Sequence, residues 1–272
     1  MAAVLGIDAA WTPHNPSGIA LVRQSSCGGW ECICVSHSYE LFLANAGRPT
    51  PTEPQEIIAA VLEVASVLAE QPIHLVAADI PLSKIPITCR RKADNLVSQK
   101  FGSRGCAAHS PIKTRPGPIG EALFNACADA GYTLATDPQG LNTPALIEVY
   151  PHPALLALMG KDYRLPYKTG KTRTYWPGKD IAERIYELRA VMDGILTRLK
   201  LQFAGIPLAE CPECPTLRGL KQTEDQIDAL ICCWTGVLAI EGEAVALGDQ
   251  DAAIWVPKES IKVSGRLAVG HA

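Results

Sequence analysis

Aromatic side chains are scarce in this sequence, since Phe, Trp and Tyr make up only 6% of its 272 residues. A protein that holds single-stranded nucleic acid by stacking needs a series of exposed rings, so no such stacking platform is expected. Long apolar runs are also missing, and stretches such as Ala229–Cys233 are far too short to cross a bilayer. The sequence therefore gives no reason to expect a membrane-embedded protein.

Positive charge is absent from the N-terminal stretch Met1–Ile7, which passes directly into a strand-like apolar segment. A secretory signal begins with a positively charged region, so no signal peptide is expected. The ten cysteines are scattered, and Cys232 and Cys233 are adjacent in an apolar helical pattern. This usage is typical of reduced, buried thiols and predicts a cytoplasmic protein. Cys211 and Cys214 form a single CxxC motif without a second pair, so neither a zinc site nor redox chemistry is expected there.

The net charge of -3 does not by itself predict binding to nucleic acid, but the charge is unevenly distributed. Two segments, 84–115 and 161–179, hold 14 of the 25 basic residues and only two acids, Asp94 and Asp162. A mildly acidic body with two basic, loop-rich segments would attract a polyanion to those segments. Two solvated surface stretches would give the same pattern, so the charge alone leaves both interpretations open.

The hydrophobic pattern predicts an α/β protein with a mixed sheet and helices on both faces. Three strands separated by short turns indicate an antiparallel meander, and later, nearly continuous apolar runs indicate buried parallel strands. The expected strands are Ala3–Asp8, Ser17–Val22, Trp30–His37, Ile73–Ile80, Ala145–Tyr150 and Ala253–Val256. The expected helices are Gln55–Ala69, Arg90–Lys100, Gly120–Ala130, Lys179–Leu199 and Thr223–Ile240. We expect residues 1–272 to form a single domain with a basic insertion at about 84–140.

Acidic side chains follow two of the apolar strands. Asp8 ends the first strand and is followed by the small residues Ala9 and Ala10, while Asp79 ends a later buried strand. Ionised carboxylates rarely stand in such apolar surroundings unless they are paired or bind metal. Each Asp could instead cap a turn, but two strands that end in the same way favour a shared site.

A third acidic element lies in the late helix. Asp225 and Asp228 are three residues apart, so they lie on one helix face about 5–6 Å from each other. If Thr223 caps this helix, acids in its first turn also suit the helix dipole, which explains Glu224 and Asp225. That account explains Asp228 poorly, because Asp228 precedes the apolar stretch Ala229–Trp234 and is expected to face inward. Clustered carboxylates of this kind suit Mg²⁺ or Mn²⁺, and two such ions can promote phosphodiester cleavage.

Four stretches carry a resemblance to a known family: Gly6–Trp11, Ala78–Pro81, Glu148–Pro153 and Glu224–Leu230. They resemble the signatures of the family known as domain of unknown function 429, whose members are predicted nucleases of the ribonuclease H-like fold. The matches run in order from residue 6 to about residue 257. The wider fold is similar to that of Holliday-junction resolvases, in which acids from a first strand, a later strand and a late helix bind metal. The resemblance implies that Asp8, Asp79, Asp225 and Asp228 are metal ligands, that Mg²⁺ or Mn²⁺ is the cofactor, and that a homodimer is conceivable.

Further candidates belong to the same stretches or to the basic segments. Glu148, inside an expected strand, could be another metal ligand. His152, expected in a proline turn that ends this strand, could donate a proton or contact substrate, although a structural role explains it as well. His14 follows Asp8 closely and could reach the site. The candidates for phosphate contact are Arg90, Arg91, Lys113 and Arg173.

The pattern of acids and basic segments predicts a metal-dependent nuclease that acts on DNA or RNA. A non-catalytic module that binds nucleic acid or protein on the same fold is an alternative, since fold does not guarantee activity. A phosphotransferase of the actin and sugar-kinase type is less favoured. Such enzymes need Gly-rich phosphate turns after the first strand, whereas Ala9–Pro13 reads Ala-Ala-Trp-Thr-Pro.

Overall fold

The computed structural model describes residues 1–12, 15–26, 28–208 and 215–262. The strands are β1 (Ala3–Asp8), β2 (Gly18–Gln24), β3 (Trp30–Ser36), β4 (Leu75–Ala78), β5 (Thr133–Leu134), β6 (Ala145–Val149), β7 (Phe203–Ala204), β8 (Ala244–Gly248) and β9 (Ala253–Pro257). They join in one sheet in the order β7-β3-β2-β1-β4-β6-β9-β8, and β5 pairs with β6 beside this path. The predicted α/β architecture with a mixed sheet is confirmed.

The direction of the strands follows the expected sequence of antiparallel and then parallel pairing. Strands β1, β2 and β3 are antiparallel neighbours, whereas β4 pairs parallel to β1, β6 to β4 and β9 to β6. The edge strand β8 returns antiparallel to β9 and was not predicted. Strands β5 and β7 were also missed, since two residues are too few to show an alternating pattern.

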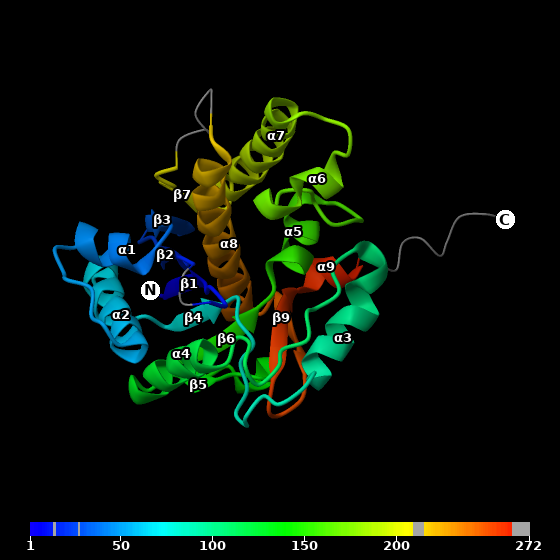
Figure 1. Cartoon of the computed structure of the whole chain (residues 1–272). Coiled ribbons are helices and arrows are strands. Elements are labelled where there is room, and N and C mark those ends of the chain that lie inside the picture. The colour runs from blue at the N-terminus through cyan, green and yellow to red at the C-terminus, as the bar shows by residue number, and fades with distance from the viewer. Residues whose placement is uncertain (13–14, 27, 209–214, 263–272) are drawn as a thin grey trace.

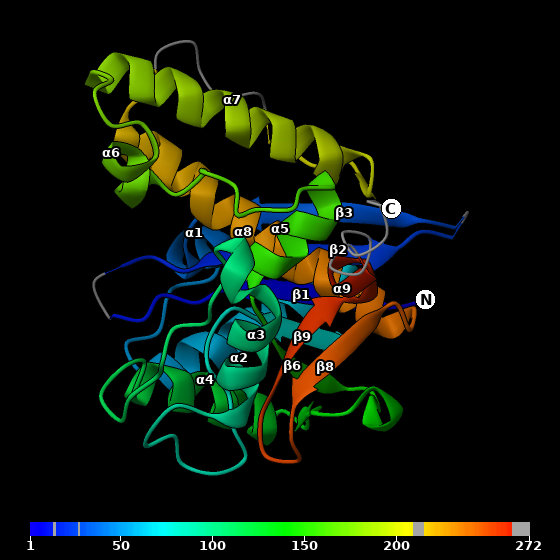
Figure 2. The ribbon, with the colours of Figure 1, turned by 90° about the vertical axis from the view of Figure 1, so that its right-hand side faces the viewer.

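Helices cover both faces of the sheet. They are α1 (Tyr39–Asn45), α2 (Pro54–Ala69), α3 (Lys92–Phe101), α4 (Pro118–Asp129), α5 (Pro151–Met159), α6 (Thr172–Tyr175), α7 (Ile181–Lys200), α8 (Leu217–Ile240) and α9 (Lys258–Lys262). Figure 2 shows α8 lying along the sheet with α7 above it, and α2 and α4 on the opposite face. Two apolar clusters, one on each face, form the core.

Helix α8 is the central helix of the molecule (Figure 1). Seven successive residues, from Ile227 to Cys233, are fully buried, because the sheet lies on one side of the helix and α7 and α5 pack against it as well. The helix can approach the sheet closely because glycines face it. A Cβ atom at Gly6 would overlap the Ala229 carbonyl oxygen, and one at Gly18 would overlap the Asp225 carbonyl oxygen. These two glycines bring the acids of α8 next to the end of β1.

Helix α8 begins earlier than the sequence indicated, and helix α5 was not predicted. Helix α8 begins at Leu217, where the Thr216 side chain accepts a hydrogen bond of 3.1 Å from the Gly219 N–H. The alternative account in which Thr223 caps this helix does not hold, since its hydroxyl donates to the Gly219 carbonyl inside the helix. Pro151 does not only end a strand: it is the first residue of α5, a position where its missing N–H costs no helical hydrogen bond.

The segment 84–140 contributes to both layers. Val97 and Phe101 of α3 pack into the core on the α8 side, and Leu123 and Cys127 of α4 pack into the core on the α2 side. Cys232 and Cys233 are free and buried, as expected. None of the described helices is both long and apolar enough to span a membrane. Three residues considered above, His14, Cys211 and Cys214, lie outside the described residues.

Candidate functional site

Asp8 and Asp79 lie side by side at one end of the sheet. Ile7 of β1 pairs with Ala78 of β4, and the Asp79 N–H donates a hydrogen bond of 2.8 Å to the Ile7 carbonyl. Side chains alternate along a strand, so Asp8 shares the sheet face of Val4, and Asp79 shares that of Ala77. Both of these apolar residues belong to the core on the α8 side. The two carboxylates therefore point toward α8.

Helix α8 brings its acids to the same place. Glu224, Asp225 and Asp228 are all buried, with 4%, 2% and 0% of their surfaces exposed. They stand in the second and third turns of the helix, because the helix begins at Leu217. Attraction of the helix dipole for acids in the first turn therefore does not explain them. Glu224, which the sequence interpretation assigned to that first turn, is part of the buried acidic cluster.

Three successive residues of the loop before α6 bind these acids. The Tyr167 hydroxyl donates to Asp228 Oδ1 at 2.7 Å, and the Lys168 ammonium is bonded to Asp228 Oδ2 and lies 3.4 Å from Glu224 Oε1. The N–H and hydroxyl of Thr169 donate to Glu224 Oε2 at 2.7 and 2.8 Å. Within α8, Lys221 pairs with Glu224 at 3.0 Å and with Asp225 at 2.5 Å.

Three carboxyl groups of the cluster have raised pKa values, in spite of the two lysines beside them. Burial, with the neighbouring charge of Asp228, raises the pKa of Asp8 well above its usual value, although Lys168 opposes this shift. The same causes raise the pKa of Asp79 to about 8. Burial also raises the pKa of Asp225, against the opposing effect of Lys221. The positive charges of Lys168 and Lys221 therefore do not balance the negative charge of the cluster.

The donor chemistry of the cluster suits a hard divalent cation. Asp225 Oδ2 is buried without a hydrogen-bond partner, and the side chains of Asp8 and Asp79 make no hydrogen bond to a described residue. Carboxylate oxygens are the ligands that Mg²⁺ and Mn²⁺ prefer. As they stand, no three His, Cys, Asp or Glu side chains of the described ranges converge closely enough to hold a metal ion. The Lys168 ammonium instead binds Asp228.

Glu148 lies near Asp79, whose pKa its charge helps to raise, but it has a cationic partner of its own, Arg91. It pairs in register with Ala78 of β4. Its two oxygens accept hydrogen bonds of 2.5 and 2.7 Å from Arg91, and Oε2 also accepts one from the Leu82 N–H. Arg91 donates to Asp94 and to the Leu82 carbonyl as well, so all five of its N–H groups are used. This buried network ties α3 to β4 and β6.

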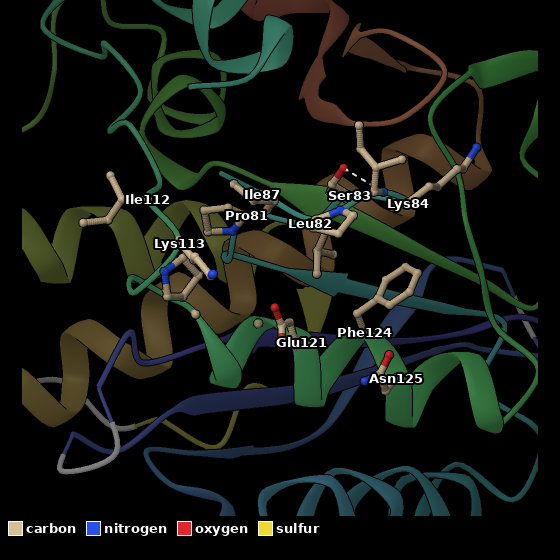
Figure 3. A pocket seen from close by; sticks show the side chains of 15 residues that line it. Pro81, Leu82, Ser83, Lys84, Ile87, Ile112, Lys113, Glu121, Phe124 and Asn125 are labelled. Carbon is tan, nitrogen blue, oxygen red and sulfur yellow. Dashed lines mark hydrogen bonds between the residues drawn. The ribbon is translucent and has the colours of Figure 1, made fainter. Parts of the chain in front are cut away.

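The other basic candidates lie apart from the carboxylates. Arg90 donates all five N–H groups to atoms of residues 94–110, so it holds this segment in place. Arg173 is exposed on α6. Lys113 lines a separate cavity of about 240 Å³ next to the turn after β4. Figure 3 shows this cavity between the segment from Pro81 to Ile87 and helix α4, which contributes Glu121 and Asn125.

His152 is the second residue of α5 rather than part of a turn. Its ring lies between those of Tyr150 and Tyr167, with centroids 5.3 and 5.5 Å away, and its Nδ1 atom is buried without a partner. Burial, reinforced by Lys168 and Arg164, lowers its pKa well below the usual value. The imidazole is therefore neutral at physiological pH, which suits a hydrogen-bonding role better than that of a cationic proton donor.

The match to known proteins extends over most of the chain. Residues 6–253 match the family described as a protein of unknown function, DUF429. The chain belongs to the DUF429 family. This match includes Asp8, Asp79, Asp225 and Asp228, so the whole carboxylate cluster of this DUF429 protein lies inside the family region. No curated protein and no solved structure matches the chain.

Proposed function

We propose that this DUF429 protein is a metal-dependent phosphodiesterase that hydrolyses nucleic acid, built on a ribonuclease H-like fold. The observation that carries the proposal is the meeting of Asp8, Asp79 and Asp228, from two neighbouring strands and the central helix, at one end of the sheet. Three antiparallel strands followed by parallel ones, with an acidic late helix against them, support the ribonuclease H-like assignment.

In this proposal Asp8, Asp79, Asp225 and Asp228 hold Mg²⁺ or Mn²⁺. The cation would supply a nucleophilic water and stabilise the leaving oxygen of the phosphodiester. The residues of the chain itself position the carboxylates: Tyr167 orients Asp228 through Oδ1, and Lys221 orients Asp225. Asp228 is fully buried, and surroundings of low dielectric constant strengthen its interaction with any cation.

A non-catalytic binding module is the second candidate, and the Lys168 contact favours it. An ammonium group bonded to Asp228 already supplies part of the positive charge that the carboxylates need. A protein that never binds metal could use Lys168 permanently in this way. The two functions differ in their response to divalent cations, which only the nuclease requires.

The test is hydrolysis of end-labelled single-stranded and duplex DNA and RNA with Mg²⁺, with Mn²⁺ and with a chelator. The wild type should cleave at least one substrate only when metal is present, and Asp79→Asn should lose that activity. Asp162→Asn, which changes an exposed acid outside the cluster, is the matched control and should stay active. Substrate binding without cleavage under any metal condition would favour the non-catalytic module.

A further inference from the structure

A second group of charged side chains surrounds a cavity next to the carboxylate cluster. The cavity has a volume of about 480 Å³, within the range of small-molecule sites. Asp79 and Lys168 line it, so it is continuous with the cluster. Arg164, Lys171, His109 and His152 line it as well.

The positive charges of Arg164 and Lys171 are not neutralised by the protein. Neither of them, nor the His109 imidazole, pairs with a carboxylate of the described residues. Burial and the neighbouring charges of Lys171 and Arg164 lower the pKa of His109, and burial with Arg164 and Lys168 lowers that of Lys171. Two acids of the same cavity pair with other cations that line it, Glu148 with Arg91 and Glu224 with Lys221.

Unpartnered polar atoms give a second, independent sign of a ligand. His152 is only 6% exposed and its Nδ1 atom has no hydrogen-bond partner, and Arg164 Nε is likewise buried and unpartnered. Buried polar atoms are normally hydrogen-bonded, and each exception calls for an explanation. An oxyanion in the cavity would accept hydrogen bonds from the Arg164 guanidinium and compensate the charge of Lys171.

We propose that this cavity is a phosphate subsite that binds the phosphate group of a nucleotide through Arg164 and Lys171, with His109 and His152 as further contacts. The choice of a nucleotide rests on the proposed function, because the subsite adjoins the carboxylates that would cleave the neighbouring phosphodiester. Trp11 lines the same cavity and offers an aromatic ring to the nucleoside. Of these residues, the sequence singled out only His152, as a proton donor or substrate contact.

The test is calorimetric titration of inorganic phosphate and of uridine 5′-monophosphate into the full chain, with a chelator present so that no metal contributes. Wild type should bind both, and the nucleotide more tightly. Arg164→Met and Lys171→Met should each weaken binding on the order of tenfold. Lys171 is exposed, so its variant is expected to fold even if Arg164→Met does not. Lys161→Met, which changes an exposed lysine of the same basic segment outside the cavity, is the matched control and should bind as wild type does.

Each outcome decides a separate claim. Absence of binding in the wild type, or equal loss in Lys171→Met and Lys161→Met, would overturn the subsite. Nucleotide binding no tighter than that of inorganic phosphate would overturn the assignment to a nucleotide. Asp228→Asn should keep its phosphate affinity while losing metal binding, so failure of the subsite and failure of the proposed function are distinguishable. Loss of phosphate binding in Asp228→Asn would contradict two separate sites.

Discussion

Lys168 supplies positive charge inside the acidic cluster. Its ammonium binds Asp228 and lies 3.4 Å from Glu224 Oε1, so it supplies charge where a divalent cation would otherwise bind. A ligand and an internal group that need the same carboxylate compete for it. Binding of metal at Asp228 therefore requires that the Lys168 side chain move or share its partner.

Replacement of Lys168 by Met should tighten Mn²⁺ binding, on the order of tenfold or more, because the competing ammonium is removed. The same change should lower the free energy of unfolding in chelator by about 3–5 kcal/mol, since it leaves Asp228 buried without its cation. Calorimetry and urea unfolding measure the two effects, and added Mn²⁺ should restore stability. Lys200→Met, at the exposed end of α7, is the control. Weaker Mn²⁺ binding in Lys168→Met would show that Lys168 supports the metal site.

Asp79 gives the cluster a pH dependence. Its pKa of about 8 in the folded chain, against about 4 when unfolded, means that the folded state retains a proton between these values. Unfolding free energy in chelator should therefore fall as pH rises from about 4 to about 8, by at most about 1.4 kcal/mol per pH unit from this group.

Asp79→Asn lacks this proton and should lose less stability over the same range. Its advantage over the wild type should be absent near pH 4, grow with pH, and level off above about pH 8. Urea unfolding at several pH values measures the difference between the two proteins. A difference that stays constant across the range would show that Asp79 titrates normally.

For single residues, the sequence predicted which acids belong to the cluster better than it predicted their basic partners. Asp8, Asp79 and Asp228 could be chosen because each stands at the end of an apolar segment. Lys168 was not chosen, and Arg91 was chosen as a phosphate contact rather than as the partner of Glu148. A basic residue in a loop carries no sign of which distant acid it will meet. Glu224 could be read from the sequence as an acid near the start of the helix. The structure starts the helix at Leu217, after the Thr216 cap, so Glu224 stands in the second turn and not in the first.

At the scale of elements, the close crossing of α8 over β1 and β2 determines the geometry of the site. The strands themselves follow from apolar runs, and β1 was predicted with its exact bounds, Ala3–Asp8. The crossing depends on glycines whose importance is invisible until the helix is placed against them. Gly6 and Gly18 leave room for the helix backbone, so the acids of α8 lie beside Asp8.

Substitution of Gly6 by Ala should push α8 away from the sheet, because the new methyl group meets backbone atoms of Ala229 and Cys233. Overpacking of this kind costs typically about 1–3 kcal/mol in unfolding free energy. Mn²⁺ affinity should fall as well, since the acids of α8 move with the helix. Gly170→Ala is the matched control, because no atom lies within 4 Å of its added Cβ. Stability and metal affinity equal to those of wild type would contradict the close crossing.

At the scale of the whole molecule, charge separates into a mildly acidic body and two basic segments. The structure uses these segments in different ways: Arg90 and Arg91 hold the fold together, Lys168 balances the cluster, and Arg164 and Lys171 line the adjacent cavity. Basic residues such as Lys113 and Arg173 remain exposed and available to a polyanion. The charge distribution in the sequence predicted attraction of a polyanion. It could not show which basic residues bind acids of the protein and which stay exposed.

Nucleic-acid binding should therefore weaken steeply with salt, because phosphate contacts release counterions. The double variant Lys113→Met and Arg173→Met should reduce the slope of log affinity against log salt by up to about 2, or about 1 per lost phosphate contact. Fluorescence anisotropy with a labelled oligonucleotide measures the slope. Lys200→Met with Lys161→Met removes the same charge from other exposed positions and serves as the control. An equal change in both double variants would mean that overall charge alone governs binding.

The central claim is that Asp8, Asp79, Asp225 and Asp228 bind a divalent cation. Calorimetric titration of Mn²⁺ and Mg²⁺ into the metal-free full chain tests it most directly, with wild type, Asp8→Asn and the control Asp162→Asn measured side by side. The account predicts saturable binding in the wild type and in Asp162→Asn, and none in Asp8→Asn, whose fold is retained or slightly stabilised as like charges are relieved. Absence of binding in the wild type, both alone and with nucleic acid, would contradict it.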